Sequence, residues 1–140
     1  MELRLYGNNL GKLPVNLFAG LSKLQELDLG YNKLSELPAE VFSGLSSLQW
    51  LNLGDNKLGE LPVEVWDHLF AGLDNLRLLN LGDNKLGDLP AEVWANMFSG
   101  LGSLQELYLW GNDLSELPAI CSAIRCVATS RRRIPHLKTG

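Results

Sequence analysis

Histidine, cysteine and long apolar runs are scarce in this sequence, and each scarcity argues against a class of protein. With only two histidines, His68 and His136, a Ser/His/Asp or Cys/His catalytic site has almost no material. The two cysteines, Cys121 and Cys126, have no flanking histidine and so do not form a zinc motif. No apolar run approaches the ~18 residues that a membrane-spanning helix needs. We therefore expect no enzyme, no metal or cofactor site and no membrane span.

Charge is divided unevenly along the 140 residues. Residues 1–120 contain 7 Lys/Arg and 16 Asp/Glu, a balance of −9, whereas residues 121–140 contain 5 Lys/Arg and no acid, a balance of +5. An acidic body does not attract the phosphates of nucleic acid, so nucleic acid is not expected as a partner. The basic end holds Arg131, Arg132 and Arg133, and we expect residues 130–140 to form a flexible tail. The N-terminus has no long apolar segment and does not read as a secretory signal.

One motif recurs along residues 1–118 and sets the organisation of the chain. It has the form Leu-x-x-Leu-x-Leu-x-x-Asn-x-Leu-x-x-Leu-Pro, and its second copy contains Leu24, Leu27, Leu29, Asn32 and Leu34. The asparagines of the motif are separated by 24, 24, 28 and 28 residues, and they are Asn8, Asn32, Asn56, Asn84 and Asn112. This spacing predicts five repeats, at about residues 1–23, 24–47, 48–75, 76–103 and 104–118.

Each fixed position of the motif has a physical reason. In Leu-x-Leu the side chains alternate between two faces, so stacked repeats should form a parallel sheet of short strands over a leucine core. The asparagine follows the strand, where the chain turns away and leaves backbone groups without ladder partners. A buried amide can donate to one turn and accept from the next, so we expect the five asparagines to form a ladder between repeats. No single repeat can bury its own apolar face, and stability should therefore come from stacking.

The segment after each Leu-Pro step should form the opposite, convex side. A phenylalanine recurs there in four repeats and is expected to stack as an aromatic spine of Phe18, Phe42, Phe70 and Phe98. Repeats three and four are longer by four residues, close to the 3.6 residues of one helical turn. We therefore expect a short helix in each of them, with irregular or 3₁₀ structure in the first two. Trp66 and Trp94 begin these extensions and should pack over the convex side.

The phenylalanine is missing from the fifth repeat, and the segment that follows Pro118 allows two structures. Ile120, Ile124 and Val127 fall at i, i+4 and i+7, which predicts a capping helix over residues 119–129. The alternative is a disulfide between the two cysteines. The two structures exclude each other, because five residues of helix rise roughly 7.5 Å, beyond the ~7 Å between Cα atoms that a disulfide tolerates. The apolar spacing favours the helix with free thiols.

The motif Leu-x-x-Leu-x-Leu-x-x-Asn-x-Leu-x-x-Leu-Pro-x-x-x-Phe-x-x-Leu, carried by residues 1 to about 120, resembles the typical subfamily of leucine-rich repeats. Toll-like receptors, matrix proteoglycans and variable lymphocyte receptors contain such repeats. The resemblance implies an α/β leucine-rich-repeat solenoid, a curved horseshoe with a parallel sheet on its concave face and loops or short helices on its convex face. It also implies extracellular placement and a recognition module of innate-immune or receptor type that binds a protein or glycan ligand through the concave face.

The residues of the concave face follow from the strand register. The outward positions that we expect to bind the ligand are Tyr6, Asp28, Tyr31, Trp50, Asn52, Asp55, Leu78, Asn80, Asp83, Glu106, Tyr108 and Trp110. Nothing in the expected fold needs to bury the apolar members, and aromatic side chains are frequent in binding hot spots. Binding energy should concentrate in Trp50, Asn52, Asn80, Tyr108 and Trp110. We interpret Asp55 and Asp83 as solvated acids that favour a basic partner, rather than as a cation site.

A structural or assembly protein that acts mainly through self-association is the alternative function. The sequence opens directly in a repeat, so Leu3, Leu5, Leu10 and Leu13 should face outward at the N-terminal edge. Exposed strand edges invite pairing with another chain. We therefore expect a homodimer that covers this edge.

Overall fold

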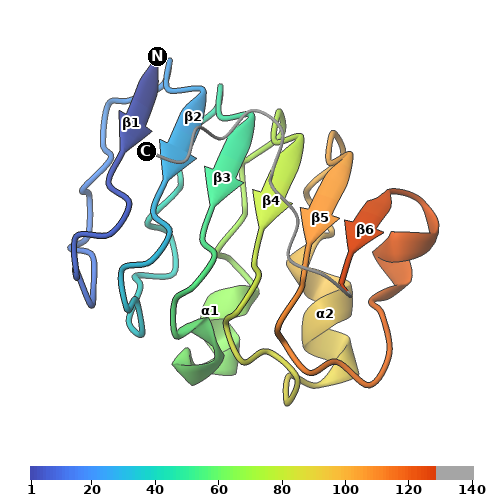
Figure 1. Cartoon of the computed structure of the whole chain (residues 1–140). Coiled ribbons are helices and arrows are strands. Elements are labelled where there is room, and N and C mark those ends of the chain that lie inside the picture. Colours follow the sequence, from blue (N-terminus) through green and yellow to red (C-terminus); the bar gives the residue numbers. More distant parts are fainter. Residues whose placement is uncertain (129–140) are drawn as a thin grey trace.

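Parallel strands stacked in chain order form the frame of the molecule. The structure, a computed structural model, describes residues 1–128, so the tail expected at 130–140 lies outside the described residues. The strands are β1 (Glu2–Arg4), β2 (Glu26–Asp28), β3 (Trp50–Asn52), β4 (Leu78–Asn80), β5 (Glu106–Tyr108) and β6 (Arg125–Val127). Each strand pairs in parallel with the next one along the chain, so the order is β1-β2-β3-β4-β5-β6 (Figure 1). The predicted parallel sheet is confirmed, and β6 extends it by a strand that the repeats did not predict.

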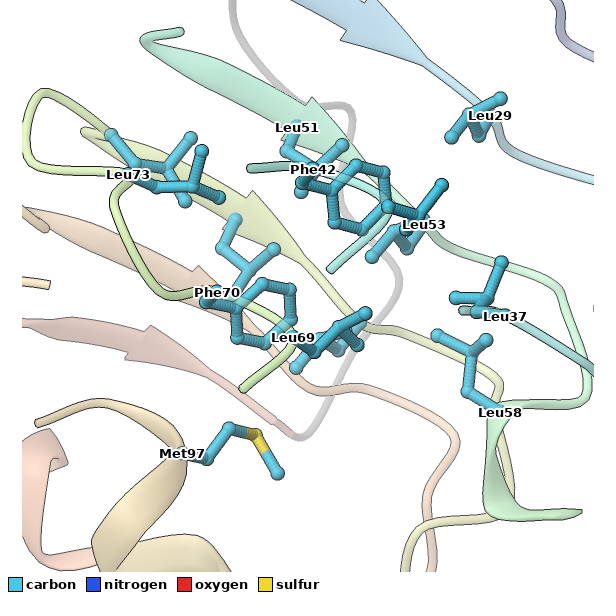
Figure 2. Packing of buried hydrophobic residues seen from close by; sticks show 14 of the residues in the cluster. Leu29, Leu37, Phe42, Leu51, Leu53, Leu58, Leu69, Phe70, Leu73 and Met97 are labelled. Carbon is cyan, nitrogen blue, oxygen red and sulfur yellow. The ribbon is translucent and has the colours of Figure 1, made fainter. Parts of the chain in front are cut away.

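Leucines on the inner side of the strands form the core. The central residues of four consecutive strands are in register and at most 1% exposed, and they are Leu27, Leu51, Leu79 and Leu107. Phe42 and Phe70 pack behind them from the convex side (Figure 2). All four phenylalanines of the predicted spine are buried, and the rings of Phe18 and Phe42 stack with centroids 6.1 Å apart. Each fully buried apolar side chain contributes about 1.5–3 kcal/mol relative to an exposed one, so the stacking of repeats supplies most of the stability.

The asparagine ladder is also confirmed. The Nδ2 group of Asn56 donates to the carbonyl oxygens of Leu53 in its own repeat, at 2.9 Å, and of Leu29 in the preceding repeat, at 3.1 Å. Its Oδ1 atom accepts from the backbone N–H groups of Asn32 and Leu34, each at 3.0 Å. Asn32, Asn84 and Asn112 make equivalent bonds across neighbouring repeats. One amide thus satisfies buried backbone groups of two turns at once.

The longer third and fourth repeats carry the predicted helices on the convex side (Figure 1). They are α1 (Val63–Trp66) and α2 (Ala91–Met97), and a 3₁₀ turn at Leu58–Glu60 precedes the first. Each helix starts after a proline, Pro62 or Pro90, in extended conformation. Repeats one and two form turns there instead. The side chain of Trp66 is 1% exposed and packs edge-on against Phe70, and half-buried Trp94 stacks on Phe98, so both tryptophans pack as expected.

The capping helix predicted over residues 119–129 is wrong, and so are the free thiols. A 3₁₀ turn occupies Ala119–Ser122, after which the chain reverses into β6. The turn brings the Cα atoms of Cys121 and Cys126 within 5.4 Å, and the two cysteines form a disulfide. Pairing with β5 explains the preference for a strand. The backbone N–H of Leu109 donates to the carbonyl oxygen of Val127 at 2.8 Å, so β5 is not left as an open edge of the sheet.

The N-terminal edge differs in part from its prediction. Leu13 is buried in the core, with 5% of its surface exposed, whereas Leu3, Leu5 and Leu10 are half-buried against it. Within residues 1–128, no helix is long and apolar enough to cross a membrane.

Candidate binding face of the sheet

Three rows of side chains cross the concave face, one at each outward position of the strands. The first row contains Glu2, Glu26, Trp50, Leu78, Glu106 and Arg125. The second row contains Arg4, Asp28, Asn52, Asn80, Tyr108 and Val127. The third row, just beyond the strands, contains Tyr6, Gly30, Gly54, Gly82 and Trp110. The concave face is therefore defined by these three rows and by the turn residues that follow them.

Three predicted site residues, Tyr31, Asp55 and Asp83, lie in those turns and not in a strand row. Their backbone φ angles are 57°, 56° and 53°, in the left-handed region. Side chains alternate between the two faces only as far as the strand extends, and this alternation ends where the chain turns. The three residues therefore occupy the repeat position directly after the one that Tyr6 and Trp110 hold in their own repeats. Two of them still border the face, because the carboxylate of Asp83 accepts a hydrogen bond from the indole N–H of Trp110 at 3.2 Å and the ring of Tyr31 lies 5.9 Å from that of Tyr6. Asp55 occupies the equivalent turn position of the third repeat.

Glycines in the third row let large side chains lie directly over the backbone. A Cβ atom on Gly82 would approach the Trp110 ring to 2.5 Å, and one on Gly30 would approach the Tyr6 ring to 2.9 Å. Both contacts are shorter than real side chains allow. Tyr6 and Trp110 therefore lean inward over the neighbouring repeats, from the two ends of the row.

A second polar ladder, which the repeat motif did not indicate, fixes the middle of the face. The Nδ2 group of Asn80 donates to Oδ1 of Asn52 at 2.7 Å, and Nδ2 of Asn52 donates to Oδ1 of Asp28 at 2.9 Å. Each of the three side chains also accepts from the backbone N–H of the glycine two residues later, at 2.9–3.0 Å. The repeated Asx-x-Gly spacing is the signal that could have predicted this ladder, since Asp and Asn side chains often bond to the backbone two residues on.

Three of the predicted ligand-binding residues form this ladder. Asp28, Asn52 and Asn80 are at most 9% exposed, and their polar atoms bond to one another. The structure brings the three side chains together, and their hydrogen bonds join the ends of β2, β3 and β4.

Apolar side chains gather at the C-terminal half of the face. Leu78, Tyr108, Trp110 and Val127 form a cluster in which none is more than 9% exposed, and half-buried Trp50 packs against it. The rings of Tyr108 and Trp110 meet edge-on with centroids 5.6 Å apart. The prediction that nothing buries Leu78, Tyr108 and Trp110 is therefore wrong, and Val127 of β6 belongs to the cluster that they form.

Aromatic surface is accessible at the other end of the face. Tyr6 and Tyr31 are 55% and 58% exposed, and their ring centroids lie 5.9 Å apart. With half-buried Trp50 between this pair and the cluster, exposure of the aromatic side chains decreases from the first repeat toward the last.

Acidic side chains outnumber basic ones on the concave face. The acids are Glu2, Glu26, Asp28, Asp55, Asp83 and Glu106, against the bases Arg4 and Arg125, so the formal balance is −6 + 2 = −4. Arg4 pairs with Glu2 at 3.0 Å and with Glu26 at 4.0 Å, and Arg125 pairs with Glu106 at 3.6 Å. Burial raises the pKa of the Glu26 carboxyl above its ordinary value, and the neighbouring Glu2 carboxylate raises it further. Within the described part of the chain, no group of three or more His, Cys, Asp or Glu residues is arranged to hold a metal ion.

Known proteins with similar sequence or structure agree with this architecture. Among solved structures, the Toll chain of the Toll–Spatzle complex from Drosophila is 29% identical, with a TM-score of 0.66 over 80% of this chain. Human 5T4, the trophoblast glycoprotein, has the same fold, at 23% identity and a TM-score of 0.54 over 91% of this chain. The chain spans 14% of the matched Toll chain and 69% of the matched 5T4 chain. A comparison with curated protein sequences finds no match.

The family follows from the repeats themselves. The sequence profile described as "Leucine rich repeat" matches residues 1–58 and 62–114, which is most of the chain. The predicted solenoid, with its parallel sheet, inward leucines and asparagine ladder, is thereby confirmed at the level of family and fold. The chain belongs to the leucine-rich-repeat family.

Proposed function

We propose that this protein is a recognition module that binds a protein partner through its concave face and performs no chemistry on it. The observation that carries the proposal is the run of aromatic side chains along that face, from the exposed pair Tyr6 and Tyr31 through Trp50 to the cluster around Trp110. Aromatic side chains give a large contact area at a small loss of conformational entropy, and they dominate many binding hot spots.

The rigidity of the face supports the same function. The ladder of Asp28, Asn52 and Asn80 holds three strand ends together, and the apolar cluster joins β4, β5 and β6. A partner that meets a surface already in its bound conformation does not have to order it, so more of the contact energy appears as affinity.

Charge favours a partner with basic groups. The excess of acids on the face should speed the encounter with such a partner and disfavour acidic competitors. In this proposal Asp55, Asp83 and Glu106 border the aromatic contacts, while the buried side chains of Leu78, Tyr108 and Trp110 support the contact surface from beneath. A glycan is the second ligand class, supported by the accessible ring faces of Tyr6 and Tyr31.

The similar proteins support a protein ligand and extracellular placement. The matched Toll chain was solved in complex with Spatzle, and this complex is described as a molecular hub in Drosophila development and innate immunity. The Cys121–Cys126 disulfide points the same way, because disulfides persist mainly in oxidising compartments. We therefore propose that this chain acts outside the cell as a receptor-type recognition module, and more specifically in innate immunity.

The tryptophans provide a test that does not require the natural partner. Trp50 and Trp110 lie on the concave face, whereas Trp66 and Trp94 pack on the convex side. Binders selected from a displayed protein library would be titrated against isotopically labelled protein, and the four indole N–H signals followed by NMR. The signals of Trp50 and Trp110 should shift, while those of Trp66 and Trp94 stay in place. Selected binders that shift only the convex pair would contradict the proposal.

Self-association is the second candidate function. Val15 and Leu17 are 69% and 41% exposed in the first repeat, beside half-buried Leu3, Leu5 and Leu10. A homodimer that pairs two N-terminal edges would cover these side chains. Sedimentation equilibrium across the micromolar range distinguishes the two cases: a dimer that Val15→Asp and Leu17→Asp dissociate supports self-association, whereas a monomer at every concentration excludes it.

A further inference from the structure

We propose that the basic segment that follows the sheet, residues 129–140, binds the concave face of its own chain and competes there with an external partner. The inference rests on the proposed function of that face and names a regulator for it. It depends on where the described chain ends, how far the following residues reach, and the charge on each side.

The described chain ends just after β6, at Ala128, where the concave face and the core side of the sheet meet. Val127, the last residue of β6, is in register with Tyr108, and its side chain belongs to the apolar cluster of that face. The strands are parallel, so β6 ends at the same edge of the sheet at which Asp55 and Asp83 follow β3 and β4. The residues after Ala128 therefore start beside the face that carries the acids.

The reach of the segment matches the positions of these acids. Neighbouring strands lie ~4.8 Å apart, so Asp83, two strands from β6, is about 10 Å away across the sheet, and Asp55, three strands away, is about 14 Å. An extended chain advances ~3.3 Å per residue, which carries it about 10 Å by Arg131 and about 17 Å by Arg133. The three consecutive arginines can thus reach both acids without any rearrangement of the sheet.

The charges of segment and face are complementary. Residues 129–140 contain Arg131, Arg132, Arg133 and Lys138 and no acid, whereas the face has a formal balance of −4. Arginine also stacks on aromatic rings, which the face presents at Trp50 and farther along at Tyr31. Because the segment is covalently attached, its effective concentration at the face is in the millimolar range, so even weak intrinsic binding gives substantial occupancy.

A second possible binding place for the segment lies near the end of the described chain, and its charge is less favourable. A hollow of about 580 Å³ at the last repeat is bordered by Asp113, Glu116 and Arg125, besides apolar residues and Ala128. Two acids and one base leave it a balance of −1, against −4 for the concave face. Occupation of this hollow is therefore the competing outcome that the experiment must separate.

A spin label on the segment measures its position in the full-length protein. Both native cysteines are in the disulfide, so Thr139→Cys introduces a unique thiol for a nitroxide label. The label should broaden the indole signals of Trp50 and Trp110 more than those of Trp66 and Trp94. Substituting Arg131, Arg132 and Arg133 by Ser in the labelled protein is the matched control, and it should remove the difference, as should high salt.

Three results would overturn the inference. Equal broadening of all four indoles means that the segment does not settle on the face. Broadening confined to the amides of residues 113–117 places it in the hollow. Broadening of an unlabelled, isotopically enriched copy mixed with the spin-labelled protein assigns the contact to a second molecule.

Competition gives an independent readout. The Arg131, Arg132 and Arg133 to Ser variant should bind a concave-face binder about tenfold more tightly than the wild type, because the binder no longer displaces the segment. An unchanged affinity would contradict the inference while leaving the proposed function intact. Binders that do not shift Trp50 and Trp110 at all would instead contradict the proposed function.

Discussion

Replacing Asn56 by Ala tests the physical basis of the asparagine ladder. The side chain is 7% exposed and makes five hydrogen bonds, two as acceptor from the N–H groups of Asn32 and Leu34 and three as donor to the carbonyl oxygens of Leu29, Leu53 and Gly54. An alanine leaves two buried N–H groups without their acceptor. At about 1–3 kcal/mol for each unsatisfied group, the free energy of unfolding should fall by about 2–6 kcal/mol.

Asn8 provides the matched control, because it occupies the same repeat position at the end of the stack. Its side chain is exposed and donates to the carbonyl oxygens of Leu5 and Tyr6. Asn8→Ala removes the same atoms but leaves no buried donor, so its loss should be about 1 kcal/mol or less. Urea denaturation followed by circular dichroism gives both values. Equal losses for the two variants would refute the argument that bonds between repeats, rather than the amide itself, provide the stability.

Three further predictions concern single sites. Burial raises the pKa of Glu26, so its ionised form destabilises the fold, and Glu26→Gln should raise the melting temperature at pH 7. The difference in melting temperature between the variant and the wild type should shrink as the pH falls through the raised pKa. A difference that does not depend on pH would contradict this. Replacing Cys121 and Cys126 by Ala should lower the free energy of unfolding by about 2 kcal/mol, because the closed loop is short; an unchanged urea midpoint would count against it. Gly111→Ala should destabilise by about 1 kcal/mol or more, since φ is +71° and a Cβ would collide with the Asp83 carboxylate, whereas Gly102→Ala, with open space around it, should not.

The fold was predictable because the same sequence motif recurs in every repeat. Leu-x-Leu indicated which strand side chains face the core, and the positions of Asn56 and its equivalents indicated the ladder. The added helical turn in repeats three and four correctly placed α1 and α2 near Trp66 and Trp94. Such inferences depend on local periodicity, which five copies make unambiguous.

The structure of the segment after Pro118 could not be predicted from local periodicity. Ile120, Ile124 and Val127 fit a helical spacing, but the open edge of β5 offers backbone hydrogen bonds that a helix would leave unused. In the structure Ile120 and Ile124 still pack against the core, while Val127 belongs to the opposite face of the sheet. A tertiary contact thus decided a structure that local spacing described wrongly.

The sequence predicted which strand residues lie on the concave face, but it did not predict how deeply their side chains are buried. Strand alternation placed Trp50, Leu78 and Tyr108 outward as observed. The burial of Leu78 and Tyr108 involves Val127, which the sixth strand brings onto this face and which no repeat indicated. Tyr31, Asp55 and Asp83 were assigned to strand positions although they lie in left-handed turns, where alternation has ended.

The central claim, that the concave face is the binding surface, is tested most directly at two neighbouring residues of β3. Trp50 lies on the concave face, half-buried, whereas Leu51 points into the core and is fully buried. Melting temperature and affinity for the same selected binder would be measured for Trp50→Ala and Leu51→Ala.

Trp50→Ala should weaken binding by about 2 kcal/mol or more, roughly 30-fold, and lower the melting temperature much less than Leu51→Ala, because Trp50 is only half-buried against the apolar cluster. Leu51→Ala should lose about 2–5 kcal/mol of stability through an unfilled cavity and keep its affinity while folded. If Trp50→Ala unfolds the protein, or leaves the affinity as it was, the concave face is not the binding surface.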